Sequence, residues 1–122
     1  MKPASAKAKG RALQQYVAGL IVNSFFGLEA DDVVSRPMGS GGSDLLMSPM
    51  AQRLFPVSTE CKNLKTHPGP AALEQAAYNA YRDTIPVVAW KPPRKGMEET
   101  LAILKYVDLI RLVQQLRKNC HV

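Results

Sequence analysis

The chain has 122 residues, which suits one compact domain spanning residues 1–122. A hydrophobic fraction of 46% and a charged fraction of 21% are ordinary for a globular protein and exclude fibrous and wholly disordered classes. The net charge of +6 favours a polyanionic partner, either nucleic acid or an anionic membrane surface. Two cysteines, with neither a disulfide framework nor zinc-type spacing, indicate a reducing cytoplasm.

The first part of the chain is expected to form a loose end over residues 1–3 and then one long helix over residues 4–25. Apolar residues recur there at three- and four-residue steps and define one buried face. That face is predicted to consist of Leu13, Val17, Leu20, Ile21 and Phe25. Gly27 suits the C-terminal cap of the helix. The uncharged run over residues 16–28 is too short to span a bilayer, so no membrane partner is expected.

The middle of the chain is expected to form three strands in a β-meander. Short apolar or β-branched runs predict the strands, and Pro and Gly interrupt them. The predicted elements are a strand over residues 31–36, a flexible Gly/Ser loop over 39–43, a strand over 44–48, a turn or short helix over 49–54 and a strand over 55–62.

The last part of the chain leaves two alternatives. An Ala-rich helix over residues 71–82, a strand over 85–90 and a basic loop over 91–96 come first. A strand over 100–106 followed by a helix over 108–118 is favoured over one long helix from 98 to 118. The fold class is therefore α/β, with a mixed β-sheet flanked by helices.

Asp44, Glu60 and Lys62 are the candidate catalytic residues. Side chains alternate along a strand, so Glu60 and Lys62 share a face while Cys61 points into the other one. A neighbouring strand can place Asp44 beside Glu60, and two adjacent carboxylates call for a cation between them. Mg²⁺ is expected, with Mn²⁺ able to substitute, because it takes oxygen ligands and shares its shell with phosphate. No small-molecule cofactor is expected.

A Glu-x-Lys triplet by itself is weak, since it also fits a solvated surface pair at a strand edge. Here the triplet ends an apolar strand, an aspartate follows a Gly/Ser loop, and an Ala-rich helix comes next. This context favours a nuclease, in which Lys62 orients the attacking water or offsets charge on phosphorus.

The order of elements and motifs resembles the PD-(D/E)XK nuclease superfamily, whose restriction-endonuclease-like core runs α-βββ-α-β. The similarity is closer to archaeal-type Holliday-junction resolvases and related small phage endonucleases. It rests on residues 9–11, 36–44, 60–63 and 72–76. It implies a homodimeric, Mg²⁺-dependent endodeoxyribonuclease of DNA recombination that cuts branched DNA, in the host cytoplasm if a phage encodes it.

The resemblance also assigns roles to individual residues. Asp44 and Glu60 would be the metal ligands and Lys62 the catalytic lysine. Gln75 would line the site or place a water, although an exposed helix glutamine is the plain alternative. The resolvases carry a glutamate on the first helix where this chain has Gln14 and Gln15.

A DNA-binding surface is expected around these residues. Its candidates are Lys9, Arg11, Gln14, Arg36, Ser40, Asn63, Lys65, Arg94 and Lys95. Each charged member is also consistent with an ordinary surface residue. A site-selective duplex endonuclease and a non-catalytic DNA-binding module stay open as alternatives. The last helix and the strand over residues 85–90 are candidates for the dimer contact.

Overall fold

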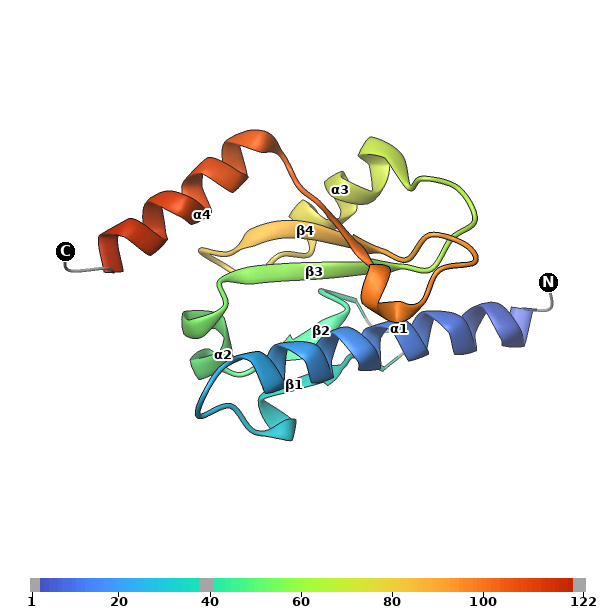
Figure 1. Ribbon diagram of the computed structural model, residues 1–122, viewed down its shortest axis with the longest axis horizontal. Coiled ribbons are helices and arrows are strands. Elements are labelled where there is room, and N and C mark those ends of the chain that lie inside the picture. Colours follow the sequence, from blue (N-terminus) through green and yellow to red (C-terminus); the bar gives the residue numbers. More distant parts are fainter. Residues whose placement is uncertain (1–2, 38–40, 120–122) are drawn as a thin grey trace.

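The computed structural model describes residues 3–37 and 41–119 and has an α/β fold, with a mixed sheet flanked by helices, as predicted (Figure 1). The elements in chain order are α1 (Pro3–Ser24), η1 (Ala30–Asp32), β1 (Val33–Ser35), β2 (Leu45–Met47), α2 (Pro49–Leu54), β3 (Val57–Lys62), α3 (Gly69–Tyr78), β4 (Ile85–Trp90), η2 (Met97–Glu99), β5 (Leu101–Ile103) and α4 (Tyr106–Asn119). A loose end was expected over residues 1–3, but α1 already begins at Pro3, and residues 1 and 2 lie outside the described part.

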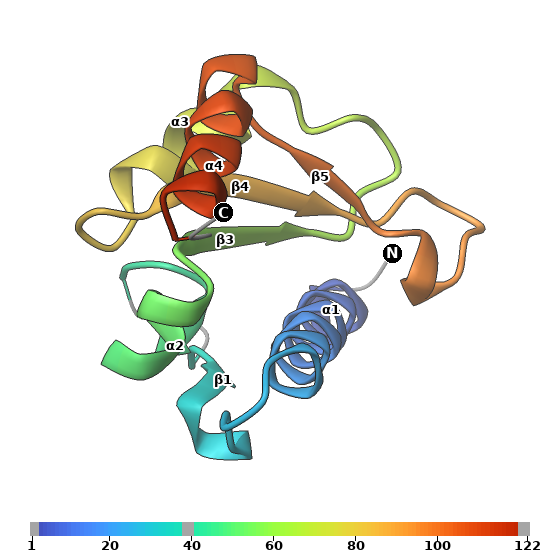
Figure 2. The ribbon, with the colours of Figure 1, turned by 60° about the vertical axis from the view of Figure 1, so that its left-hand side comes forward.

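The strands form two sheets rather than one meander, so this prediction was wrong. β1 and β2 make an antiparallel pair. In the other sheet β3 is parallel to β4, and β4 is antiparallel to β5. The sheet containing β3 lies between α1 on one side and α3 on the other (Figure 2).

Side chains rather than a backbone ladder join β2 to β3. The Asp44 carboxylate accepts a hydrogen bond from the Cys61 N–H at 2.7 Å, and the Ser43 hydroxyl donates to the Thr59 carbonyl at 3.3 Å. The Tyr81 hydroxyl accepts from the Met47 N–H and donates to the Leu45 carbonyl, each at 3.2 Å. Buried backbone groups need partners, and Tyr81 supplies them on the edge of β2 that a third strand would otherwise occupy.

Tyr81 also explains why α3 ends at Tyr78 instead of residue 82. The Asn79 N–H still bonds to the Gln75 carbonyl, but the Tyr81 N–H donates to the Ser58 hydroxyl of β3. The chain must therefore leave the helix before Tyr81. After β4, the favoured alternative of a strand followed by a helix is confirmed by β5 and α4.

The main core lies between α1 and the strands. Leu13, Val17 and Ile21 are buried there together with Leu45 and Cys61. Ala72 and Ala76 of α3 form a smaller cluster with Val88 on the opposite side of β4.

The prediction that Leu20 belongs to the buried face of α1 was wrong, since Leu20 is 51% exposed. The buried stripe extends instead to Gln14 and Ala18. A pattern of large apolar residues does not mark these two positions, because one residue is polar and the other is small. Phe25, just after the end of this helix, is half-buried, and its ring packs at a tilt against that of Phe55, with the centroids 5.7 Å apart.

Leu13→Ala is expected to lower the free energy of unfolding by about 3 kcal/mol, because Leu13 is fully buried and its loss leaves a cavity. Leu20→Ala is the matched control on the same helix and should change it by less than about 1 kcal/mol. Urea denaturation of both variants measures the difference. Equal losses would contradict the orientation of α1.

Candidate functional site

The structure brings Asp44, Glu60, Lys62 and Gln75 together around the end of β3. Asp44 lies one residue before β2 and its carboxylate reaches the backbone of β3 at Cys61. Burial raises the pKa of Asp44 above its usual value, while the Cys61 N–H and the charge of Lys62 act in the opposite direction. The hydrogen bond to the backbone fixes the Asp44 carboxylate next to Glu60.

Glu60 is the most unusual residue of the site. It is only 4% exposed, and among the described residues its Oε2 has no hydrogen-bond partner. Burial, and next the charge of Asp44, raise its pKa to about 7. A buried oxygen without a partner costs free energy, so this position favours either a proton or a cation.

Lys62 and Gln75 complete the group. The Lys62 ammonium donates to the Gln75 side-chain oxygen at 3.1 Å, which links β3 to α3. The positive charge of Lys62 lowers the pKa values of both Asp44 and Glu60, against the effect of burial. An ammonium beside two carboxylates, tethered by an amide, matches the predicted acid–acid–lysine arrangement.

Cys61 lies between Glu60 and Lys62 in sequence, and it contacts this cluster through its backbone N–H but not through its thiol. Its side chain is buried in the α1 core, as the alternation of the strand predicted. Burial, followed by the charges of Asp44 and Glu60, raises the pKa of the thiol far above its usual range. The thiol therefore stays protonated and is unsuited to nucleophilic chemistry.

The loop before Asp44 is held by Arg36. The Arg36 side chain donates to the Ser43 carbonyl, and its backbone N–H donates to the Asp44 carbonyl at 2.8 Å. Gly42 has a φ of 103°, and a Cβ there would lie 2.9 Å from the Arg36 guanidinium, so a glycine is needed for this approach. Arg36 thus positions Asp44. Ser40 lies outside the described residues.

Gln14 is buried in α1, and its side-chain oxygen accepts a hydrogen bond from the Ser35 hydroxyl of β1. Its partner is thus a strand of the other sheet. Within the described part of the chain, no group of three or more His, Cys, Asp or Glu side chains is placed to hold a metal. A site here would have two carboxylates, which suffices for Mg²⁺ because it keeps several waters and binds substrate phosphates.

Several predicted DNA-binding residues lie next to this site. The Asn63 side chain, just after β3, donates to the Lys9 carbonyl of α1 at 3.3 Å. The loop between β4 and β5 passes beside the N-terminal half of α1, and Met97 of this loop packs on the α1 core (Figures 1 and 2). Arg11, Lys65 and Arg94 are also exposed.

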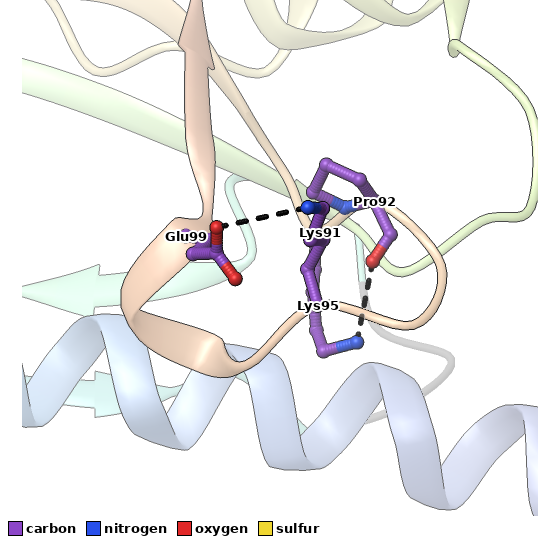
Figure 3. A network of polar contacts seen from close by, with 4 residues as sticks. All are labelled: Lys91, Pro92, Lys95 and Glu99. Atoms are coloured by element: carbon purple, nitrogen blue, oxygen red, sulfur yellow. Dashed lines mark hydrogen bonds and ion pairs between the residues drawn. The ribbon is translucent and has the colours of Figure 1, made fainter.

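Figure 3 shows how two lysines of that loop are held. The Lys95 ammonium lies 3.9 Å from Glu99 Oε1, and the Lys91 ammonium donates to the Pro92 carbonyl at 3.4 Å. The Lys95–Glu99 pair is half-exposed, so it contributes little to stability and leaves Lys95 free to exchange partners.

Sequence reasoning missed Ser43, Arg36 as a positioning residue, and Tyr81. Ser43 is 3% exposed and bridges to β3, and Tyr81 satisfies the open edge of β2. The Gly42-Ser43-Asp44 order next to a strand was a signal for Ser43. No pattern in the sequence around Tyr81 indicates its role, because its hydrogen-bond partners Met47 and Leu45 are far away in the sequence.

No family model, curated protein or solved structure matches this chain. In the part of the chain that the structure describes, no helix combines the length and the apolar character needed to cross a membrane.

The raised pKa of Glu60 predicts a pH-dependent stability of the metal-free protein. The folded state holds the proton up to a pH of about 7, whereas the unfolded chain releases it near 4.5. The free energy of unfolding should therefore fall as the pH rises through this window, by on the order of 2 kcal/mol from Glu60. Asp44 acts in the same direction.

Urea denaturation in the presence of a chelator, at pH values from 4.5 to 8, measures this slope. Glu60→Gln should reduce the slope to the part that comes from Asp44, while Glu74→Gln, on the exposed surface of α3, should leave it unchanged. An undiminished slope in Glu60→Gln would show that other groups cause it.

Proposed function

We propose that this chain is a Mg²⁺-dependent endodeoxyribonuclease of the PD-(D/E)XK type, which hydrolyses phosphodiester bonds in DNA. The observation that carries the proposal is the buried, unpartnered Oε2 of Glu60 beside Asp44. A cation there would give the oxygens of both carboxylates a partner and offset the free-energy cost of burying their charges. The tethered Lys62 is the feature that separates this site from a simple cation-binding pair.

Each residue has a distinct role in this proposal. Asp44 and Glu60 would hold the cation, and the Cys61 N–H orients the Asp44 carboxylate. Mg²⁺, when bound, supplies Lewis-acid stabilisation of the negative charge on the phosphate. Lys62 presents a donor to the same charge and stays in place because Gln75 holds its ammonium. Mn²⁺ should substitute, since its ligand preferences are similar.

The charge distribution supports DNA as the substrate. The exposed cations of α1, Lys9 and Arg11, and those of the β4–β5 loop, Arg94 and Lys95, belong to elements that lie side by side. The Asn63–Lys9 contact joins this area to the residue next to Lys62. Neutralising phosphates along such a surface releases counterions and favours binding without reading sequence.

Within this class we propose branched DNA, such as a Holliday junction, as the substrate, acted on in the cytoplasm. The test is to incubate the pure protein with a four-way junction and with linear duplexes, with Mg²⁺ and with a chelator. Paired cuts in the junction, dependent on Mg²⁺, would support the proposal. Equal cutting of plain duplex at one sequence would instead identify a site-selective endonuclease.

The non-catalytic alternative predicts a different result from the same experiment. A DNA-binding module would retain junction and duplex intact with either Mg²⁺ or Mn²⁺ while still shifting them in a gel. Calorimetric titration of the protein with Mn²⁺ then measures metal binding separately from DNA cleavage. Absence of any uptake would overturn the metal site itself.

A further inference from the structure

α4 presents more apolar surface than its packing uses. It packs on the body through Leu112, which with Leu104 covers the cluster of Val57, Ile85 and Val87. Its buried Asp108 is paired with Arg111 at 2.8 Å. The remaining large apolar side chains of the helix are exposed. They are Tyr106 (77% exposed), Val107, Leu109, Ile110, Val113 and Leu116 (70% exposed).

Four of these side chains have the spacing of a coiled-coil seam. Tyr106, Leu109, Val113 and Leu116 follow one another at steps of three, four and three residues, which matches positions a, d, a and d of a heptad. They lie on one side of α4, next to the side that holds Leu112. A seam with this spacing is shaped to pack against another helix.

The surface next to the seam is also apolar. A cleft of about 730 Å³ lies beneath the C-terminal half of α4, and its lining includes Phe25, Leu54, Phe55, Leu112 and Leu116. α4 extends along the outside of the molecule, away from α1 (Figure 1). A helix laid on the seam would thus meet apolar surface on α4 and on the rim of this cleft.

We propose that the α4 seam is a homodimer interface, in which α4 pairs antiparallel with α4 of a second copy. A seam of this kind is complementary to itself under a twofold axis, which is the commonest symmetry of protein dimers. The exposed apolar side chains of α4 present on the order of 500 Å², at the upper end of what monomers expose. The rim of the cleft adds further apolar surface next to the seam, and a standard interface takes roughly 800 Å² from each partner.

The charges of α4 favour the antiparallel orientation. Two basic residues, Arg117 and Lys118, are in its last turn. A parallel pair would bring the two basic last turns together, whereas an antiparallel pair places them at opposite ends. The helix dipoles are also opposed in that orientation, which is favourable.

Sedimentation equilibrium of the full chain tests the interface without reference to DNA cleavage, so its outcome is independent of the proposed activity. We expect a mass of twice 13.4 kDa at micromolar concentrations. Val113→Glu should raise the dimer dissociation constant at least about 100-fold, because each dimer would bury two carboxylates in an apolar seam. Gln114→Glu, which adds the same charge to the neighbouring exposed position, should leave it unchanged.

A second pair of variants tests the orientation. In the antiparallel register Leu109 lies opposite Val113 of the other copy, so mixing Val113→Glu with Leu109→Lys chains should restore association through a Glu–Lys pair. Circular dichroism of each variant checks that α4 remains folded. A mass of 13.4 kDa at all concentrations, or an undiminished dimer in Val113→Glu, would overturn the proposal. Failure of the mixture to associate would overturn the antiparallel register.

Discussion

Glu60→Gln should abolish DNA cleavage while making the metal-free protein more stable at neutral pH. The carboxylate is expected to hold a cation that supplies several kcal/mol of transition-state stabilisation. At 1.4 kcal/mol per tenfold in rate, its loss corresponds to a fall of at least about 10³-fold in kcat. The same side chain, 4% exposed and with a pKa of about 7, carries an unfavourable charge at neutral pH that glutamine lacks.

The opposite directions of these two effects make the prediction specific. A merely structural role for Glu60 would lower activity and stability together. The measurements are single-turnover cleavage of a labelled junction and urea denaturation at pH 7.5. Glu74→Gln, the same substitution at an exposed position of α3, should change neither. A Glu60→Gln protein that cleaves DNA at the normal rate would contradict the proposed metal site, whatever its stability.

Local patterns were sufficient for most of the fold. The short helix α2 and the strand β4 occur with the predicted bounds, because Pro49 begins one and a strongly apolar run defines the other. The choice of strand followed by helix for the end of the chain was also right. These elements depend on residues close to one another in sequence, where propensity and periodicity carry the information.

The pairing of strands depended on contacts that no local pattern contains. Tyr81 occupies the edge of β2 through bonds to Met47 and Leu45, which are 34 and 36 residues away. The meander was therefore predicted on adjacency in sequence alone, and the structure separates β2 from β3. The error over Leu20 has a similar origin, since the orientation of a helix is set by what it packs against, not only by its own pattern.

The candidate site was predictable in its members but not in its supports. Alternation along β3 put Glu60 and Lys62 on one side and Cys61 in the core, and the contact between Lys62 and Gln75 agrees with their expected proximity. The hydrogen bond from Arg36 to Ser43 and the unpartnered oxygen of Glu60 depend on the three-dimensional arrangement of distant segments, which no local pattern contains.

Lys62→Ala should lower kcat by about 10²- to 10³-fold, with little change in DNA affinity. Removing one donor aimed at developing negative charge typically costs this much. A single ammonium among 16 lysines and arginines contributes little to overall phosphate attraction. Fluorescence anisotropy of labelled junction in a chelator gives the affinity, and single-turnover cleavage gives the rate. Lys105→Ala, an exposed lysine between β5 and α4, is the control and should match the unmodified protein.

Gln75 is then distinguished from a catalytic residue by a double-mutant cycle. Its side-chain oxygen accepts from the Lys62 ammonium at 3.1 Å, so its role is to position Lys62. Gln75→Ala should lower kcat by about tenfold, as expected when a supporting partner is lost. Combined with Lys62→Ala, it should cause no further loss, because nothing is left to position. Additive losses in the double variant would show instead that Gln75 contacts the substrate or its water directly.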